Sequence, residues 1–194
     1  MIASAELRLM SSPRQTYAAL TSRRVRLAPP AALRRPLLVA IVIGVSMALA
    51  ATRRVGPALV ASTTLSWSYV VLLQLLIAVP LMARRARRTI GLPRAIDLYF
   101  AGHAPWSLFM LFAAAWAPSA VGRPVWPIAV AALIALGLTA RIVAAFFAVV
   151  LALDTRRALR MTIFQQAITW SVFVGINWWA SAFTPRIYEL RALW

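Results

Sequence analysis

Asp97 and His103 are the two side chains whose types and proximity along the chain could support chemistry. A histidine beside a carboxylate is the usual arrangement for proton transfer. A structural interpretation is stronger, because Arg94 lies one helical turn before Asp97 and would pair with it on a helix. Residues 102–105, Gly-His-Ala-Pro, are typical of a turn that leads into a helix. We therefore expect no catalytic residue, and an enzyme using Asp97 and His103 remains the less favoured alternative.

Arg141 is an unusual charge, because it lies inside an apolar run. A charged side chain within a membrane segment is costly, so it is a functional candidate by default. Its long side chain could instead reach the membrane surface, or it could pair with a carbonyl or a carboxylate. We favour these structural interpretations, and a role in binding a substrate or ion is the alternative.

Uncharged polar side chains occur in two of the apolar runs. Gln165, Gln166 and Asn177 lie in the last run, and Gln74 and residues 62–64 lie in an earlier one. Such groups form hydrogen bonds between membrane helices that average about 0.6 kcal/mol. We interpret them as contacts between helices, with a polar transport pathway as the alternative.

The inventory of potential ligands argues against a bound metal or cofactor. The chain has one His, no Cys and four scattered acidic residues, Glu6, Asp97, Asp154 and Glu189, whereas a zinc site needs three or four clustered ligands. Without Cys there can be no disulfide, Cys-ligated cluster or covalently attached haem. His103 could ligate a haem axially, but nothing else in the sequence indicates one. We expect no cofactor.

These side chains belong to a very apolar chain. Hydrophobic residues make up 62% of the 194 positions, compared with about 45 to 50% in soluble domains. A helix needs about 20 residues to cross a membrane, and five apolar runs are bounded by arginine or proline. The sequence predicts an all-α, polytopic transmembrane bundle of about five spans, at residues 36–53, 57–83, 98–117, 126–153 and 161–183.

The segments outside these spans are short. Residues 1–33 are predicted to form a basic arm that is partly disordered or lies on the membrane, and residues 184–194 a tail. Helical spacing of apolar residues at 92–100 predicts an interfacial helix before the third span. The arginine pair near residue 23 and the Ala-Leu-Ala at residues 48–50 leave a cleaved signal sequence as an alternative for the first run.

The basic residues predict the orientation. All 21 are arginine, and the net charge is +17. Seven lie in the arm or at the start of the first span, five at residues 84–94 and three at residues 156–160, whereas five lie in the remaining loops and tail. The positive-inside rule then places the N terminus in the cytoplasm and the C terminus outside. The absence of lysine suggests a GC-rich genome, which is a property of the source and not of the function. The expected location is a bacterial inner membrane.

The positions of the arginines also indicate partners. They cluster where apolar runs end, which favours the anionic head groups of membrane lipids at the cytoplasmic face and not nucleic acid. Small residues recur every four positions at Ala40, Gly44 and Ala48, which allows close approach of helices. We expect a packed bundle with a protein partner in the membrane or self-association.

The layout of residues 34–183 resembles the Yip-type family. The shared features are a cytoplasmic N-terminal arm, five closely packed spans and a basic turn before the last span, here residues 154–160. The resemblance implies a membrane adaptor without catalysis. We therefore expect a non-enzymatic inner-membrane scaffold, adaptor or accessory subunit. The alternatives are a component of a transport system, in which Arg141 and Gln165 or Gln166 line one polar cavity, and an intramembrane enzyme.

Overall fold

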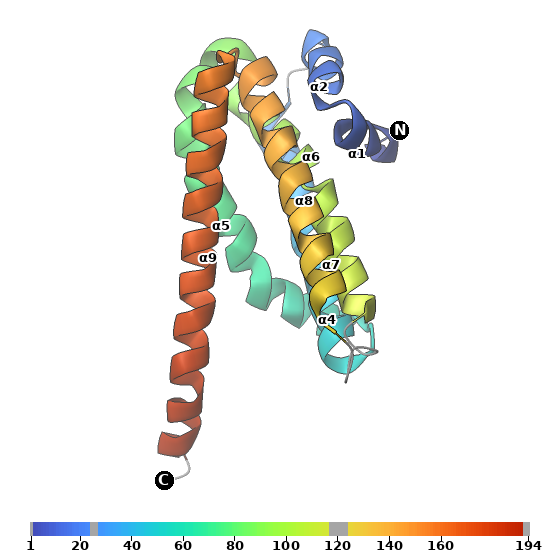
Figure 1. The fold of residues 1–194 in the computed structure, drawn as a ribbon, viewed down its shortest axis with the longest axis vertical. Helices are drawn as coiled ribbons and strands as arrows, with labels where there is room; N and C mark the ends of the chain where they lie inside the picture. The colour runs from blue at the N-terminus through green and yellow to red at the C-terminus, as the bar shows by residue number, and fades with distance from the viewer. Residues whose placement is uncertain (1, 24–26, 117–123, 192–194) are drawn as a thin grey trace.

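The computed structural model describes residues 2–23, 27–116 and 124–191, and the secondary structure of this part is entirely helical (Figure 1). The predicted all-α class is therefore confirmed. The elements, in chain order, are α1 (Ile2–Ser11), α2 (Pro13–Ser22), α3 (Pro29–Ala32), α4 (Arg34–Thr52), α5 (Pro57–Thr89), α6 (Leu92–Ala101), α7 (Ala104–Trp116), α8 (Trp126–Ala145), the short π-helix η2 (Phe146–Val150) and α9 (Thr155–Arg191).

The helix ends follow from local sequence. Pro13 and Pro57 begin α2 and α5, where the missing N–H of proline is not needed for a helical hydrogen bond. Arg53 ends α4 with a φ of 58°. Gly91 separates α5 from α6 with a φ of 84°, a left-handed conformation that glycine adopts without steric cost.

Three helical stretches are long and apolar enough to cross a membrane, judged by length and composition: Pro29–Thr52, Pro57–Thr89 and Trp126–Val150. Helices α6 and α7 pass the same test only together, and they are bent by 41° at the break between them. The described residues thus contain three such helices, or four if the bent pair is one span. Helix α9 does not pass, because Gln165, Gln166 and Asn177 lower its hydropathy. Five spans are therefore not confirmed.

Several boundaries differ from the predicted ones. Helix α5 continues beyond residue 83 through the arginine cluster to Thr89. The predicted third span, 98–117, is broken at Gly102 and His103, and its last residue lies outside the described part. The fourth ends at Val150 in a π-helical turn, and α9 continues through residues 184–191 of the predicted tail.

Helix α6 occupies the segment for which an interfacial helix is predicted. Most of its side chains are buried in the protein, including those of Ala95, Leu98 and Phe100. The helix is thus a packed element, and its placement at a membrane interface is not confirmed.

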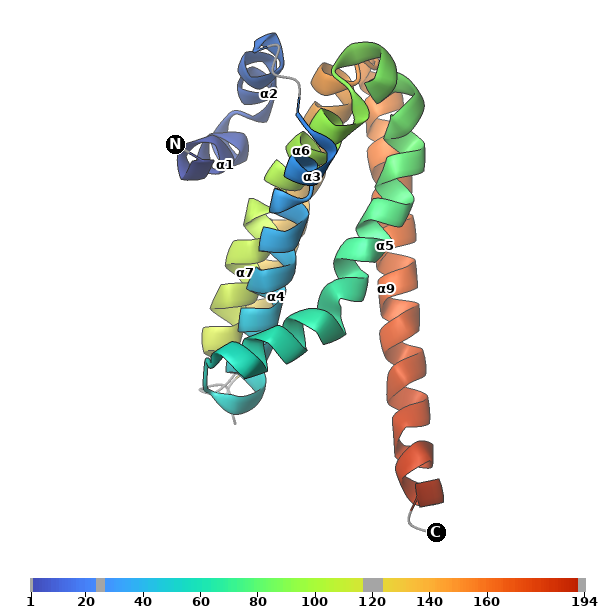
Figure 2. The same cartoon turned by 180° about the vertical axis from the view of Figure 1, so that it is seen from behind.

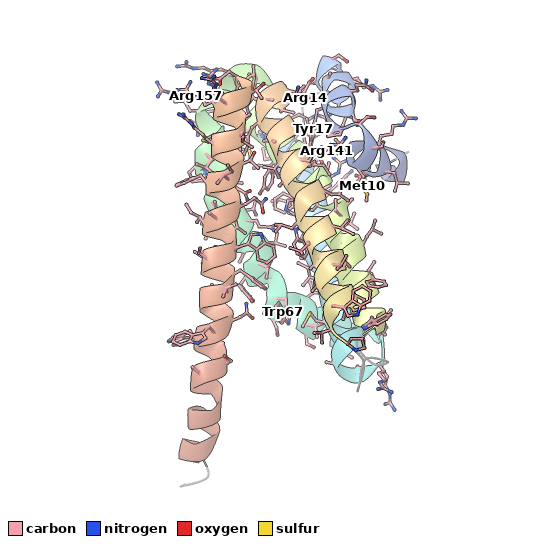
Figure 3. All side chains as sticks on the ribbon, viewed as in Figure 1. Met10, Arg14, Tyr17, Trp67, Arg141 and Arg157 are labelled. Atoms are coloured by element: carbon pink, nitrogen blue, oxygen red, sulfur yellow. The ribbon has the colours of Figure 1, made fainter. Side chains whose placement is uncertain are left out.

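The long helices form two groups. Helices α4, α7 and α8 run side by side, whereas α5 starts beside the end of α4 and crosses to α9 (Figures 1 and 2). Helices α1 and α2, the end of α5 and the start of α9 lie at the same end of the molecule, which we call the arm end. Figure 3 shows Arg14 and Arg157 at this end. The basic segments that were predicted to share one side of the membrane are therefore close together.

The α4–α5 crossing depends on a small residue. A Cβ added at Gly44 would lie 2.8 Å from the backbone N and Cα of Thr64. The Thr63 hydroxyl donates to the Gly44 carbonyl oxygen at 2.8 Å. Ala40 and Ala48, which share this face of α4, are also buried. The predicted close approach of helices is confirmed at Gly44.

Helices α1 and α2 of the predicted arm are ordered and packed against the rest of the protein, so this described part of the arm is not disordered. That the arm lies on the membrane stays a prediction. Leu9 of α1 and Tyr17 of α2 are fully buried, and α2 packs against α8 and η2. This packing was not predicted, because the two helices have only ten residues each and bury their apolar side chains against segments far along the chain.

Candidate functional site: buried polar side chains at the arm end

Asp97 is the centre of a charged cluster formed by Glu6, Arg35, Arg94 and Asp97, which we call the arm-end ion cluster. One carboxylate oxygen of Asp97 lies 2.6 Å from Arg35 Nη1, and the other lies 3.3 Å from Arg94 Nη1. Arg35 also pairs with Glu6 at 3.1 Å. The predicted pair of Arg94 and Asp97 is confirmed. The contacts to Arg35 were not predicted, because their partners lie far along the chain.

The arm-end ion cluster joins three helices. Glu6 belongs to α1, Arg35 to the first turn of α4, and Arg94 and Asp97 to α6. Asp97 is only 6% exposed, so its charge is largely removed from water and depends on both arginines for compensation. The cluster therefore ties the arm to the bundle.

Tyr17 provides a second attachment of the arm. Its hydroxyl donates to the Leu98 carbonyl oxygen at 3.2 Å, and its ring packs edge-on against Phe146. Burial raises the pKa of the Tyr17 phenol well above its usual range, and the neighbouring Tyr99 adds to this effect. The phenol consequently remains a hydrogen-bond donor at neutral pH.

Arg141 binds the arm as well. Its Nη2 donates to the Ser11 carbonyl oxygen at 2.7 Å, so the predicted structural pairing with a carbonyl is confirmed. Figure 3 shows Arg141 at the face of α8 that meets α1 and α2. Arg141 also lines a cavity of about 400 Å³ together with Ser12 and Arg14.

His103 lies in the break between α6 and α7 and is 3% exposed. Its Nδ1 is 3.3 Å from the Tyr99 carbonyl oxygen, and its ring stacks on Phe100 with a centroid distance of 4.7 Å. Within the described residues, no hydrogen bond or ion pair joins His103 to Asp97. The pair proposed for proton transfer is therefore not assembled.

The glutamines of α9 form a chain of hydrogen bonds. Gln165 Nε2 donates to the Tyr99 hydroxyl at 2.8 Å and to Thr169 Oγ1 at 3.1 Å. Gln166 Nε2 donates to Gln165 Oε1 at 3.0 Å, and its own oxygen accepts from Trp170 Nε1 at 3.1 Å. These bonds connect α9 to α6, so the predicted role in helix contacts is confirmed for Gln165.

Asn177 forms a hydrogen bond to another helix, whereas no such bond is found for the Gln74 side-chain oxygen among the described residues. Asn177 Nδ2 donates to the Tyr69 hydroxyl of α5 at 3.1 Å and to the Phe173 carbonyl oxygen at 2.8 Å. Gln74 Oε1 is buried without a hydrogen-bond partner among the described residues. The predicted contact between helices is therefore confirmed for Asn177 and not for Gln74.

Two adjoining cavities lie beside these glutamines. A larger one of about 350 Å³, with mostly apolar walls, lies between α4, α5, α7, α8 and α9. A smaller one of about 20 Å³ is lined by Gln74, Tyr99, Thr139 and Gln165, among others. Arg141 lines neither of them. A transport pathway would be favoured if Arg141 and Gln165 lined one cavity, but they line separate ones.

The described part of the chain contains no group of three or more His, Asp or Glu side chains that could hold a metal ion. No protein-family model matches the chain, and no curated protein and no solved structure has detectable similarity to it.

Proposed function

We propose that the chain is a non-enzymatic membrane scaffold, an adaptor or accessory subunit that holds a partner within a bacterial inner membrane. The observation that carries this proposal is that the candidate polar residues join elements of the fold to one another. Asp97 connects α6 with α4, Arg141 connects α8 with the arm, and Gln165 connects α9 with α6. Side chains committed to such contacts suit a structural role better than turnover.

The two alternatives have less support. An enzyme using Asp97 and His103 requires the two side chains to face a common substrate, whereas Asp97 is held by arginines and His103 by a backbone carbonyl. A transport pathway through Arg141 and Gln165 requires one continuous polar cavity, and these residues line separate ones. The resemblance to Yip-type adaptors also implies a role without catalysis.

The surface that would hold the partner is the far half of α9. This half extends away from α4, α7 and α8 (Figures 1 and 2). Val174 is 59% exposed and Trp178 is 70% exposed. Van der Waals packing drives the association of membrane helices, and a large aromatic side chain provides an extensive packing surface. The partner expected on this surface is an apolar membrane helix.

Purification in a mild detergent, with the mass of the complex measured by light scattering, tests this proposal. We expect a stoichiometric partner protein or a second copy of the chain, and we expect the double substitution Val174→Ala and Trp178→Ala to release it. Leu133→Ala is the matched control, because Leu133 is 67% exposed on α8. Recovery of the unaltered protein only as a monomer would contradict a scaffold role.

The proposed orientation places the arm end in the cytoplasm. The chain has no Cys, so single cysteines can be introduced at exposed positions and labelled with an impermeant maleimide on spheroplasts. A cysteine at Val55 should be labelled, whereas cysteines at Ser12 and Thr155 should be protected. Labelling at Ser12 with protection at Val55 would invert the topology.

A further inference from the structure

The larger of the two adjoining cavities has the size and lining of a small-molecule site. Its volume is about 350 Å³, within the roughly 300 to 1,000 Å³ that is typical of ligand pockets. Aromatic side chains form much of its wall: Trp67 from α5, Trp106 and Phe109 from α7, and Trp170 and Phe173 from α9. Figure 3 shows Trp67 in the region between α8 and α9. An apolar, aromatic wall of this kind suits a flat hydrophobic ring.

One end of this cavity is polar. Gln74, His103 and Thr169 line both the larger and the smaller cavity, so the two adjoin there. A volume of about 20 Å³ is sufficient for a group the size of one water molecule or hydroxyl. The smaller cavity therefore has room for the polar end of a molecule whose apolar body lies in the larger one.

The polar atoms around the smaller cavity are of two kinds. Gln165 Nε2 donates both to the Tyr99 hydroxyl and to Thr169 Oγ1. In contrast, Gln74 Oε1 and Thr139 Oγ1 are buried and have no partner among the described residues. Buried polar atoms are nearly always hydrogen-bonded, because leaving them unpaired costs free energy. Their position identifies the place where a ligand would supply the missing bond.

His103 contributes a further acceptor. A carbonyl oxygen can only accept, so the 3.3 Å contact with the Tyr99 carbonyl places the imidazole proton on Nδ1 of the neutral ring. Nε2 is then an acceptor, and no hydrogen bond joins it to any part of the chain that the structure describes. Gln74 Oε1, Thr139 Oγ1 and His103 Nε2 can all accept, so the matching ligand group is a donor such as a hydroxyl.

No arginine, aspartate or glutamate lines either cavity. An ionised head group would therefore be buried without a counter-charge, which is strongly unfavourable in an apolar site. The ligand that fits is neutral. Most of its surface is hydrocarbon, and its polarity is confined to one end.

We propose that the two cavities together bind a neutral phenolic amphiphile, an aromatic ring with one hydroxyl and a hydrocarbon tail on the opposite side. The hydroxyl lies in the smaller cavity, where it donates its single proton to Gln74 Oε1 and accepts from the Thr139 hydroxyl. The ring lies among the aromatic side chains, and the tail extends along the apolar wall. This site is independent of the far half of α9, so it can be present whether or not the protein is a scaffold.

A titration of the full-length protein in detergent micelles, followed by tryptophan fluorescence, tests the proposal with three probes of the same length. These are 4-pentylphenol, pentylbenzene, which lacks the hydroxyl, and trans-4-pentylcyclohexanol, which lacks the aromatic ring. We expect saturable binding of 4-pentylphenol, roughly tenfold weaker binding of pentylbenzene because a hydrogen bond is lost, and intermediate binding of the cyclohexanol.

Substitutions then locate the binding. Ala132→Phe, on the cavity wall, should remove saturable binding of 4-pentylphenol, whereas Ala129→Phe, at an exposed position on the same helix, should retain it. Gln74→Leu and the nearly isosteric Thr139→Val should each weaken the binding of 4-pentylphenol and leave the affinity for pentylbenzene unchanged. The Thr139→Val result decides the question if Ala132→Phe fails to fold.

Equal affinity for 4-pentylphenol and pentylbenzene would overturn the proposal, because the polar end would then play no part. An equal loss of affinity for 4-pentylphenol and pentylbenzene in the Thr139→Val variant would also overturn the proposal. Tighter binding of the cyclohexanol would also overturn it, by assigning the site to alicyclic alcohols. A monomeric protein that still discriminates the probes would contradict the scaffold role and leave this site intact.

Discussion

At the arm end, the ion cluster of Glu6, Arg35, Arg94 and Asp97 joins three helices, whereas the far half of α9 is attached to α5 through the Asn177 contact with Tyr69. The charged groups at the arm end are buried and depend on one another, so removing one leaves its partners uncompensated. A single hydrogen bond between membrane helices contributes little to the free energy of unfolding. We therefore expect the arm end to be the more rigid of the two regions.

The largest effect is expected from Asp97→Asn. It leaves Arg35 and Arg94 without their shared carboxylate, and the free energy of unfolding should fall by about 2 to 4 kcal/mol, as for a partly buried ion pair that loses one member. Urea unfolding in detergent, followed by circular dichroism, measures the change. The control is Asp154→Asn. Asp154 accepts from the Arg157 backbone N–H at the exposed start of α9, so about 1 kcal/mol or less is expected. Equal losses in the two variants would contradict the special role of the arm-end ion cluster.

Gly44→Ala should have the next largest effect. The added Cβ would overlap the backbone at Thr64, and α4 and α5 would have to separate at a cost of about 1 to 3 kcal/mol. The matched control is Gly137→Ala, where an added Cβ meets no atom within 4 Å and the higher helix propensity of alanine should be neutral or favourable. The same unfolding assay compares them. A tolerated Gly44→Ala would show that the crossing adjusts easily.

Tyr17→Phe sharpens the comparison at the arm end. It removes the hydrogen bond to the Leu98 carbonyl oxygen and keeps the ring that packs on Phe146, so a loss of about 1 kcal/mol is expected. Hydrogen exchange of α1 and α2 should become faster, because Tyr17 holds the arm against α6. Unchanged protection of these helices would mean that the ion cluster and Arg141 suffice to hold the arm.

The smallest effect is expected from Tyr69→Phe, the same chemical change made on α5. Asn177 loses its contact with the Tyr69 hydroxyl but keeps its bond to the Phe173 carbonyl oxygen. The expected loss is therefore about 0.5 kcal/mol. Hydrogen exchange should change along α9 and not in the arm. A larger loss in the free energy of unfolding than for Tyr17→Phe would mean that the far half of α9 is held more firmly than the arm.

The parts of the site that could be predicted are those that depend on spacing along one helix. Arg94 and Asp97 are a turn apart, so their pairing follows from helical geometry. The turn at Gly102 and His103 follows from residues 102–105 in the same way. The number of spans was predicted less well, because α7 has only 13 residues and α9 carries polar side chains whose partners on other helices were unknown.

The sequence by itself determined the helical class, the approximate ends of the long helices and the gathering of arginine where apolar runs end. These properties depend on residue type and on neighbours within one or two turns. Only the tertiary structure decided that Arg35 meets Asp97, that Arg141 binds the Ser11 carbonyl and that Gln74 and Thr139 border a common cavity. Each of these contacts joins segments far apart in the chain. Helical periodicity determines the face of its own helix on which a side chain lies. The packing of whole helices determines which other helix that side chain contacts.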